Sequence, residues 1–477
     1  MSGQFLSALP TLGTRHGEAD ILTIRMTSGQ EAKIRITEDA ALAVRTCKHV
    51  SARLMPYLMF IYVLAYLDRA NLAVAKIGMQ RELRFSDSVI GFGAGIFFVG
   101  YLLLDLPGSL IVERWSARKW IARIMVSWGI AAALMGFLGG PLFGSISTVR
   151  QFYGLRLLLG IAEAGFFPGV IVYLSHWYRP QDRARAKAYF MVTQPIAIAL
   201  GVPISRWILE NAGRAGIAGW RWVFILEGFP SVLMGIVTLW YLTDRPEHAH
   251  WLSREEKQWL TDQLKADELR KAATCRVRIV DALRYRQTFL LIAVYFLMVT
   301  GNQALIFFLP SITESMQGVP VAVRTMAASL PYACSAAGIL LNGMWSHKTG
   351  ALRWHTAAPM LATAPSLMLA VVARHHVWLT MAMFCLAGFT SQAYLPAFWT
   401  MPTTLLGKSA AATAVGLICL GNLGGFAGPW LFGYLKTITG GYDGGLVVLA
   451  ACMLSAGILA TQIRMSPLLT SRNGNEN

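Results

Sequence analysis

The sequence carries little charge for its length. Only 14% of its 477 residues are Asp, Glu, Lys or Arg, whereas 55% are hydrophobic. Because soluble domains are about 25% charged, this composition excludes an ordinary soluble domain. Apolar stretches of about 20 residues, the length that crosses a bilayer as one helix, recur along the whole chain. The composition therefore predicts an all-α polytopic membrane protein.

Cysteine is also scarce, and acidic residues are outnumbered by basic ones. The six cysteines are scattered without a CxxC spacing, which predicts neither a disulfide framework nor a metal site. The sequence has no Walker motif and no Ser/His/Asp set, so we expect no ATP drive, no cofactor, no metal and no enzymatic activity. Lys and Arg number 42 against 25 Asp and Glu, a net charge of +17. In a membrane protein such an excess indicates basic cytoplasmic loops, and we expect no nucleic-acid partner.

The apolar segments divide into two sets of six. Twelve spans can be drawn, at 54–75, 88–112, 120–139, 151–174, 187–209, 221–242, 286–309, 321–344, 355–373, 377–399, 410–435 and 442–464. Between the sets, Ser253 followed by Glu255, Glu256 and Lys257 predicts a capped surface helix. The expected domains are an N-terminal tail (1–53), a six-helix bundle (54–242), a linker (243–285), a second six-helix bundle (286–464) and a C-terminal tail (465–477).

Basic residues predict the orientation of these spans. They gather in the even-numbered loops, above all in 243–285, which places the linker and both termini in the cytoplasm. Among the basic residues, only Arg69 and Arg156 lie more than three residues from an end of a predicted span. The N-terminal tail leaves alternatives open. Residues 21–37 alternate like a small hairpin, but two strands alone are marginal in water. A flexible tail, or a start codon placed too early with Met55 near the true helical start, is the other interpretation.

Several motifs recur or stand in a fixed order. Ser109-Leu-Ile-Val-Glu113-Arg114-Trp-Ser116-Ala-Arg118-Lys119 follows the second span, and Gly343-Met-Trp-Ser-His347-Lys348-Thr-Gly350-Ala-Leu-Arg353 follows the eighth. A parallel repeat of two six-helix halves is the architecture of major facilitator transporters. Further motifs are Tyr66-Leu-Asp-Arg-Ala-Asn71-Leu, Gly95-Ile-Phe-Phe-Val-Gly-Tyr101, Arg156-Leu-Leu-Leu-Gly-Ile-Ala-Glu163-Ala-Gly-Phe-Phe-Pro168-Gly and Trp220-Arg-Trp-Val-Phe-Ile-Leu-Glu227-Gly-Phe-Pro230. Together they resemble the anion:cation symporter branch of the major facilitator superfamily.

This resemblance covers about residues 54–464. It implies twelve transmembrane helices in two pseudo-symmetric bundles, and transport of acids such as tartrate, galactonate, hexuronates or phthalate. It also implies cytoplasmic gating contacts, which we assign to Asp105, Glu113, Arg114, Arg118, His347, Lys348 and Arg353. Ser109 and Ser116 replace glycines that the superfamily favours, and His347 replaces an acid. We therefore expect weaker or pH-sensitive gating contacts on the cytoplasmic side.

Two of the predicted spans, 54–75 and 151–174, each hold two charged residues well inside them, where an ionisable side chain costs at least about 2.5 kcal/mol and usually marks a pathway. Arg156 and Glu163 are seven residues apart, about 10.5 Å along one helix face, so both can face one central cavity. Asp68 and Arg69 are adjacent and therefore about 100° apart around their helix. One of them can face the cavity while the other faces a neighbouring helix, and the sequence does not decide which.

The resemblance assigns roles to these four residues. Arg156 would clamp the carboxylate of the substrate with a bidentate guanidinium. Arg69 would lie near the same site or pair with an acid. Asp68 and Glu163 would be the proton-coupling pair. Burial raises the pKa of a carboxyl and a neighbouring guanidinium lowers it, so the balance can place protonation near the working pH. The alternative is a static structural set of ion pairs.

Other polar residues within spans are candidates for the substrate site by resemblance and placement. They are Tyr66, Tyr101, Gln194, Asn302, Gln303, Thr400 and Asn422. Their hydroxyls and amides suit a polyol acid, although helix–helix hydrogen bonding explains each of them equally well. Glu227, between Trp222 and Pro230, reads better as a structural acid of the sixth span.

These patterns predict a secondary transporter that imports an organic acid anion with protons by alternating access, the anion being a tartrate-like sugar acid or a small aromatic carboxylate. A proton-coupled exporter of metabolites or drugs is one alternative, and a membrane sensor that does not translocate is another. We expect a monomer in the lipid bilayer of the bacterial inner membrane, with a small organic anion and protons as its partners.

Overall fold

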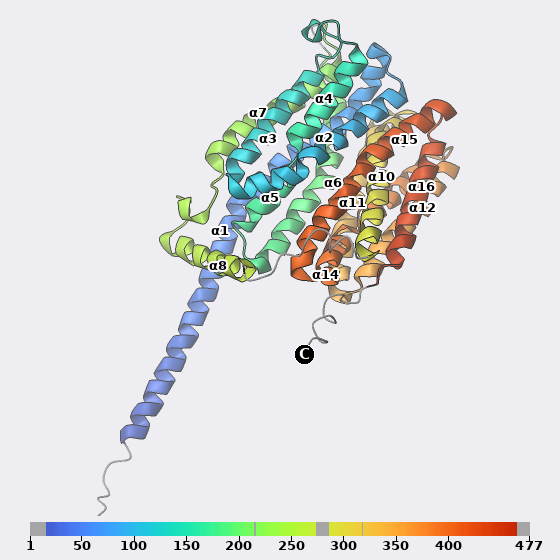
Figure 1. Ribbon diagram of the computed structural model, residues 1–477. Coiled ribbons are helices and arrows are strands. Elements are labelled where there is room, and N and C mark those ends of the chain that lie inside the picture. Colours follow the sequence, from blue (N-terminus) through green and yellow to red (C-terminus); the bar gives the residue numbers. More distant parts are fainter. Residues whose placement is uncertain (1–15, 214–215, 273–285, 317, 465–477) are drawn as a thin grey trace, which may run out of the picture.

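The computed structural model describes residues 16–213, 216–272, 286–316 and 318–464 (Figure 1). Within these ranges the regular structure is helical, with no strand. The first half contains α1 (His16–Leu83), α2 (Asp87–Arg114), α3 (Ala117–Met135), α4 (Thr148–Glu163), α5 (Phe166–Ser175), α6 (Pro180–Asn211) and α7 (Gly219–Tyr241). The linker contains α8 (Arg254–Ala272), and the second half contains α10 (Arg286–Glu314), α11 (Val321–Thr349), α12 (Leu352–Val372), α13 (Val377–Ser391), α14 (Leu395–Ile418), α15 (Gly424–Thr439) and α16 (Asp443–Thr461). Short 3₁₀ turns lie at 141–143, 246–248 and 419–423.

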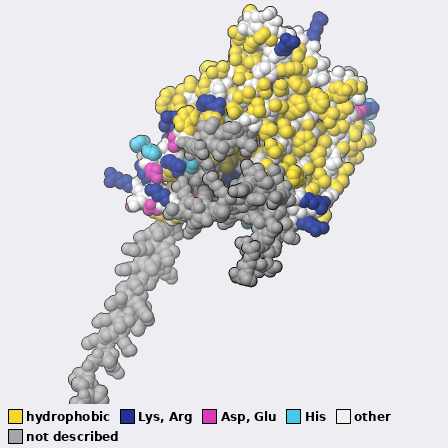
Figure 2. All heavy atoms as spheres, viewed as in Figure 1, with side chains coloured by type: hydrophobic (Ala, Val, Ile, Leu, Met, Phe, Trp, Pro, Cys, Tyr) yellow, Lys and Arg dark blue, Asp and Glu magenta, His cyan; other side chains and the backbone are white. Residues whose placement is uncertain are grey.

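Nine helical segments in the described ranges are long and apolar enough to cross a membrane. The predicted spans that fall outside this set correspond to α3, α11 and α13. Basic residues occupy the start of α3 and both ends of α11, and α13 has only 15 residues. Figure 2 shows hydrophobic side chains covering the flank of the bundles, with Lys and Arg toward its ends, as expected of a surface that faces lipid.

The N-terminal hairpin interpretation is wrong. Residues 21–37 lie within α1, which extends from the bundle as one continuous helix (Figure 1). Alternating Ile and Thr gave the strand pattern, but the segment also holds Glu31, Ala32 and Lys33, which favour a helix, and it continues directly into the first span. The predicted surface helix of the linker is present as α8. Its Ser253 hydroxyl and Glu256 carboxylate cap each other's backbone N–H at 3.2 and 3.0 Å.

Two predicted spans are broken at corresponding places in the two halves. The fourth span divides into α4 and α5 at Gly165, whose φ of 81° is a left-handed conformation that favours glycine. The tenth span divides into α13 and α14 just before Pro396. Pro168 stands in the first turn of α5, as Pro396 does in α14, because proline is tolerated where a helix begins. Each break leaves backbone N–H and C=O groups inside the bundle without their helical hydrogen bonds, as in transporters with discontinuous helices.

The two halves pack against each other through few helix pairs. Helix α2 lies on α15, α6 on α11, and α1 on α10. The α2–α15 crossing is close because Gly91 faces Gly433, and a Cβ at Gly91 would lie 2.4 Å from the carbonyl oxygen of Pro429. This approach requires glycine, and it brings α2 of one half directly onto α15 of the other.

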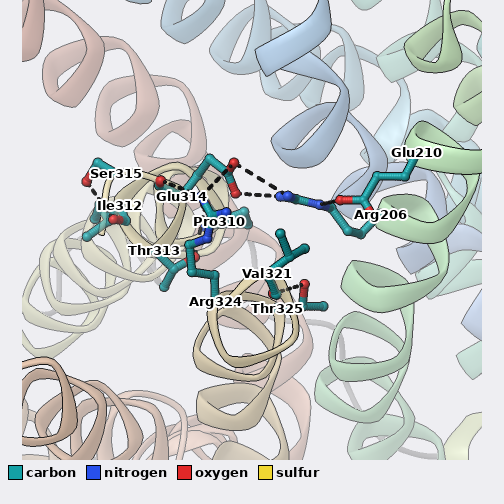
Figure 3. Close-up of polar contacts among 10 residues, drawn as sticks. All are labelled: Arg206, Glu210, Pro310, Ile312, Thr313, Glu314, Ser315, Val321, Arg324 and Thr325. Atoms are coloured by element: carbon teal, nitrogen blue, oxygen red, sulfur yellow. Dashed lines mark hydrogen bonds and ion pairs between the residues drawn. The ribbon is translucent and has the colours of Figure 1, made fainter. Parts of the chain in front are cut away.

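Ion pairs join the halves at the end of the bundle opposite the C-terminus. Arg206 at the end of α6 contacts Glu314 at the end of α10 at 2.5 Å, and Arg324 of α11 contacts the same carboxylate at 3.0 Å (Figure 3). Asp87 of α2 and Lys436 of α15 form a second bridge at 3.0 Å. These ion pairs close this end of the bundle, which faces outward in the predicted orientation. We call Arg206, Glu314 and Arg324 the outer cluster.

Candidate functional site

The centre of the site is an ion pair between the first and fourth spans. Glu163 is the last residue of α4, immediately before the break at Gly165, and it is buried. Arg69 of α1 binds its Oε1 through Nη2 at 2.6 Å and through Nε at 2.9 Å. The guanidinium also donates to the Tyr66 hydroxyl at 3.3 Å and lies 5.2 Å from the ring centroid of Tyr101. Charge-assisted bonds and aromatic faces thus hold Arg69 in one position.

The second arginine is held differently. Arg156 is only 5% exposed, and its Nε donates to the Gly93 carbonyl at 3.1 Å. Its guanidinium carbon lies 5.0 Å from the centroid of Phe97. It forms no ion pair with any described residue, although it shares a helix with Glu163. A buried guanidinium without a carboxylate partner is costly. Chemically, this arrangement can bind an anion.

A small central cavity, about 30 Å³, lies between the halves at these residues. Tyr66, Arg69, Arg156 and Phe97 line it from the first half, and Gln303 and Phe307 of α10 line it from the second. A cavity of this volume holds a few water molecules at most. A four-carbon acid does not fit, so substrate binding requires the halves to move apart. The cavity is the place where two arginines, a phenol and an amide converge.

Asp68 points away from this cavity. Its carboxylate is 3% exposed and accepts hydrogen bonds from the Trp128 indole at 2.5 Å and from the Asn71 amide at 3.0 Å. These partners come from α3 and from α1 itself. The structure thus settles the alternative that the sequence left open: α1 presents Arg69 to the cavity and Asp68 to the interior of the first half.

The remaining substrate-site candidates divide between the cavity and its surroundings. Tyr66 and Gln303 line the cavity, and Tyr101 lies against Arg69. Two amides lie elsewhere in the second half, where Asn302 accepts from Gln392 at 3.3 Å and Asn422 accepts from Tyr295 at 3.0 Å. Thr400 is exposed on α14, and Gln194 is half-buried on α6. In the described part of the chain, these last four lie outside the cavity lining.

The predicted cytoplasmic gating residues do not form one cluster among the side chains that the structure describes. Arg118 binds Asp244 and the Leu239 carbonyl, all within the first half. His347 and Lys348 are exposed on α11, and Arg353 stacks 5.4 Å from the ring of Trp354. The side chains of Asp105, Glu113 and Arg114 lie outside the described ones. The cytoplasmic gate therefore stays a prediction.

Sequence reasoning did not single out Lys76, and it interpreted Glu227 as a structural acid. Lys76 was assigned to the first loop, yet it is fully buried on α1, and its Nζ lies 3.8 Å from the centroid of Phe308 in the other half. Its position one residue beyond the predicted span was the available signal. In the described structure Glu227 is buried with one carboxylate oxygen unpaired.

Comparisons with known proteins agree with this fold. The family model described as Major Facilitator Superfamily matches residues 58–429. The chain is 38% identical over 437 residues to a putative tartrate transporter of Agrobacterium vitis, covering 91% of this chain and 97% of that one. It is 35% identical over 427 residues to a quinolone resistance transporter of Acinetobacter baumannii, covering 87% and 93%. Among solved structures, the inward open xylose transporter XylE from E. coli has a similar fold, with TM-score 0.67, 14% identity, and coverage of 86% of this chain and 95% of that one.

Proposed function

Because the chain belongs to the Major Facilitator Superfamily, whose members are transporters and not enzymes, we propose that it imports an organic acid anion together with protons. The transporter would be a monomer of the bacterial inner membrane with both termini in the cytoplasm. Its substrate would be a tartrate-like sugar acid or a small aromatic carboxylate. The relative named for tartrate transport supports this class of substrate.

The observation that carries the proposal is the buried Arg156, which forms no ion pair with an acid in the part of the chain that the structure describes. It lies in a cavity lined by both halves, where rocking of the halves exposes it to each side in turn. A carboxylate offers two oxygens with the geometry of the guanidinium fork. The hydroxyl of Tyr66 and the amide of Gln303 lie in the same lining and suit the hydroxyl groups of a sugar acid.

Proton coupling follows from competition for Arg69. While Glu163 is ionised, its carboxylate occupies Arg69 at 2.6 Å. A proton on Glu163 removes that negative charge and frees the guanidinium for a second carboxylate oxygen of the substrate. Proton and anion binding then favour each other, which is the linkage that a symporter needs. A dicarboxylate such as tartrate would use both arginines.

Export is the second candidate, and the relative named for quinolone resistance favours it. The central arginines argue for an anion in either direction, so the direction of proton-driven flux decides between them. A sensor that binds without translocation would show substrate binding and no flux at all.

The test uses purified protein in liposomes loaded at one pH and diluted into another. We expect radiolabelled L-tartrate, or another member of a panel of sugar and aromatic acids, to accumulate when the outside is acidic. Arg156→Lys keeps the charge but loses the bidentate fork, and it should reduce uptake to near background. Arg150→Lys, on the exposed start of the same helix, is the matched control and should transport normally. Near-normal uptake by Arg156→Lys would remove the carboxylate clamp from the proposal.

A further inference from the structure

A buried polar chain lies behind the cavity, inside the first half. It joins Glu227 of α7, Ser205 of α6, and Asp68 and Asn71 of α1. Glu227 is 5% exposed, and Asn71, Asp68 and Ser205 are buried as well. From α3, Trp128 completes the set by donating to Asp68. These four helices are the ones that pack around Glu227, because α7 lies against α1, α3 and α6.

The hydrogen bonds in this chain leave two oxygens without a partner. Glu227 Oε1 accepts from the Ser205 hydroxyl at 2.6 Å, while its Oε2 has no partner in the described structure. Asn71 Nδ2 donates to Asp68 Oδ1 at 3.0 Å, while Asn71 Oδ1 is equally unpaired there. Glu227 directly precedes Gly228, which packs against Gly129 of α3, and the neighbouring Trp128 donates to Asp68, so the two pairs lie on helices in contact. Two buried acceptors left unpaired would cost about 1–3 kcal/mol each.

One proton removes this cost. If Glu227 is a neutral carboxylic acid, its Oε2–H donates to Asn71 Oδ1, and both acceptors are satisfied. If the Asn71 amide rotates by half a turn, the directions of its hydrogen bonds to Asp68 and Glu227 reverse. Asp68 then carries the proton and donates to Asn71 Oδ1, while Nδ2 donates to Glu227. Amide orientation is set by such networks and both orientations fit the same shape.

We propose that Glu227 is a third proton-holding carboxyl, which shares one proton with Asp68 through Asn71. Two ionised carboxylates in one buried cluster repel each other, and no cation contacts Glu227 among the described residues, so the cluster retains one proton. This inference rests on the proposed proton coupling and extends it to a residue outside the cavity.

The position of Glu227 suits such a role. It stands eight residues from the start of α7, about 12 Å from the closed outer end. Asp68 stands 15 residues before the end of α1, about 22 Å from the same end. Asp68 directly precedes Arg69 on α1, and Arg69 binds Glu163 at the cavity. A proton from the outer side would therefore be held first at Glu227, then at Asp68, next to the substrate site.

The test compares Glu227→Gln with Ser205→Ala. Glutamine keeps the shape and can donate to Asn71, but it holds no exchangeable carboxyl proton. We expect at least a tenfold loss of pH-driven accumulation in Glu227→Gln, with substrate counterflow at equal pH within threefold of the parent. Ser205→Ala removes only the bond to Oε1 and leaves the carboxyl proton in place, so any loss should affect accumulation and counterflow equally. Full pH-driven accumulation in Glu227→Gln, or an equal loss of accumulation and counterflow in both variants, would overturn the proposal in favour of a structural acid.

A second measurement does not depend on transport. Infrared spectra of the full-length protein should contain the carbonyl band of a buried protonated carboxyl at neutral pH, and this band should be missing in Glu227→Gln and present in Ser205→Ala. If the parent protein proves to be uncoupled from protons, the proposed function fails while the band remains. If the band is identical in all three proteins, the shared proton is disproved whatever the transport assay shows.

Discussion

Neutralising the carboxylate of the outer cluster should open the outer end of the transporter. In Glu314→Gln, Arg206 loses contacts of 2.5 and 3.4 Å to the two carboxylate oxygens, which are its ionic link to the other half. Arg324 also loses its 3.0 Å contact with Glu314, but both residues belong to the second half, so this contact does not join the halves. Arg206 and Glu314 are 16% and 24% exposed, so solvent screens the pair only in part.

The size of the effect follows from this geometry. Exposed ion pairs contribute about 0–1 kcal/mol, and partly buried charge-assisted pairs with two contacts contribute about 1–2 kcal/mol. The variant should therefore favour the outward-open state over the closed state by about 5- to 30-fold, since about 1.4 kcal/mol is a factor of ten. Lys436 and Asp87 still bridge the halves, which keeps the shift within this range.

The assay measures access to a position just behind the outer cluster. Ala328 is 3% exposed and lines a cavity of about 10 Å³ beside Arg206, Glu314 and Arg324. In a background without the native cysteines, Ala328→Cys should react with a membrane-impermeant maleimide from outside several-fold faster when Glu314→Gln is present. The control is Asp443→Asn, which breaks a bridge to Arg374 at the same end but within one half. Equal labelling rates for Glu314→Gln and its parent would refute the reasoning, and labelling only from the inside would overturn the predicted orientation.

Two further predictions concern single carboxylates. Glu163→Gln mimics the protonated acid and frees Arg69. Counterflow exchange of tartrate should therefore persist, while accumulation driven by a pH gradient should fall to background. Accumulation that still follows the pH gradient would exclude Glu163 from proton coupling. In the linker, burial alone would raise the pKa of Glu256, but hydrogen bonds from the Ser253 N–H and from His49 outweigh it and hold that pKa below its ordinary value of 4.5. The cap of α8 is therefore stabilising above about pH 4.5 and is lost as the pH falls through the lowered pKa. Glu256→Gln should lower the stability of α8 by about 1 kcal/mol at neutral pH, seen as faster hydrogen exchange in α8, and a variant with unchanged exchange would contradict this.

Much of the architecture follows from the length and polarity of sequence segments, because a bilayer imposes both. The two helix breaks were not predicted, because the hydrophobicity of a segment carries no information on the positive φ of Gly165 or on the start of a new helix near Pro396. Hydrophobic periodicity also failed in the tail, where alternating Ile and Thr suggested strands. Helix continuity from α1 and good helix formers decided that segment instead.

In the site, too, some features follow from the sequence and others depend on how the helices pack. Helical spacing allowed Arg156 and Glu163 to share a face, but spacing within one helix cannot say which residue of another helix will pair with them. Only the packing of α1 on the first half places Arg69 at Glu163 and leaves Arg156 without an ion-paired acid among the described residues. For the same reason the sequence could not link Glu227 to Asn71, because their relation depends on how α7 crosses α1.

The charges of the cavity favour binding of a dicarboxylate and a proton together. With Glu163 ionised, Arg69, Arg156 and Glu163 sum to +1, and a bound dianion would bring the cavity to −1. With Glu163 protonated, the two arginines alone give +2, and the same dianion brings the cavity to zero. Because net charge in a buried site is costly, the dianion binds best to the protonated cavity. The apparent affinity for a dicarboxylate should therefore rise as the pH falls, and in Glu163→Gln it should be high and lose its dependence on this proton.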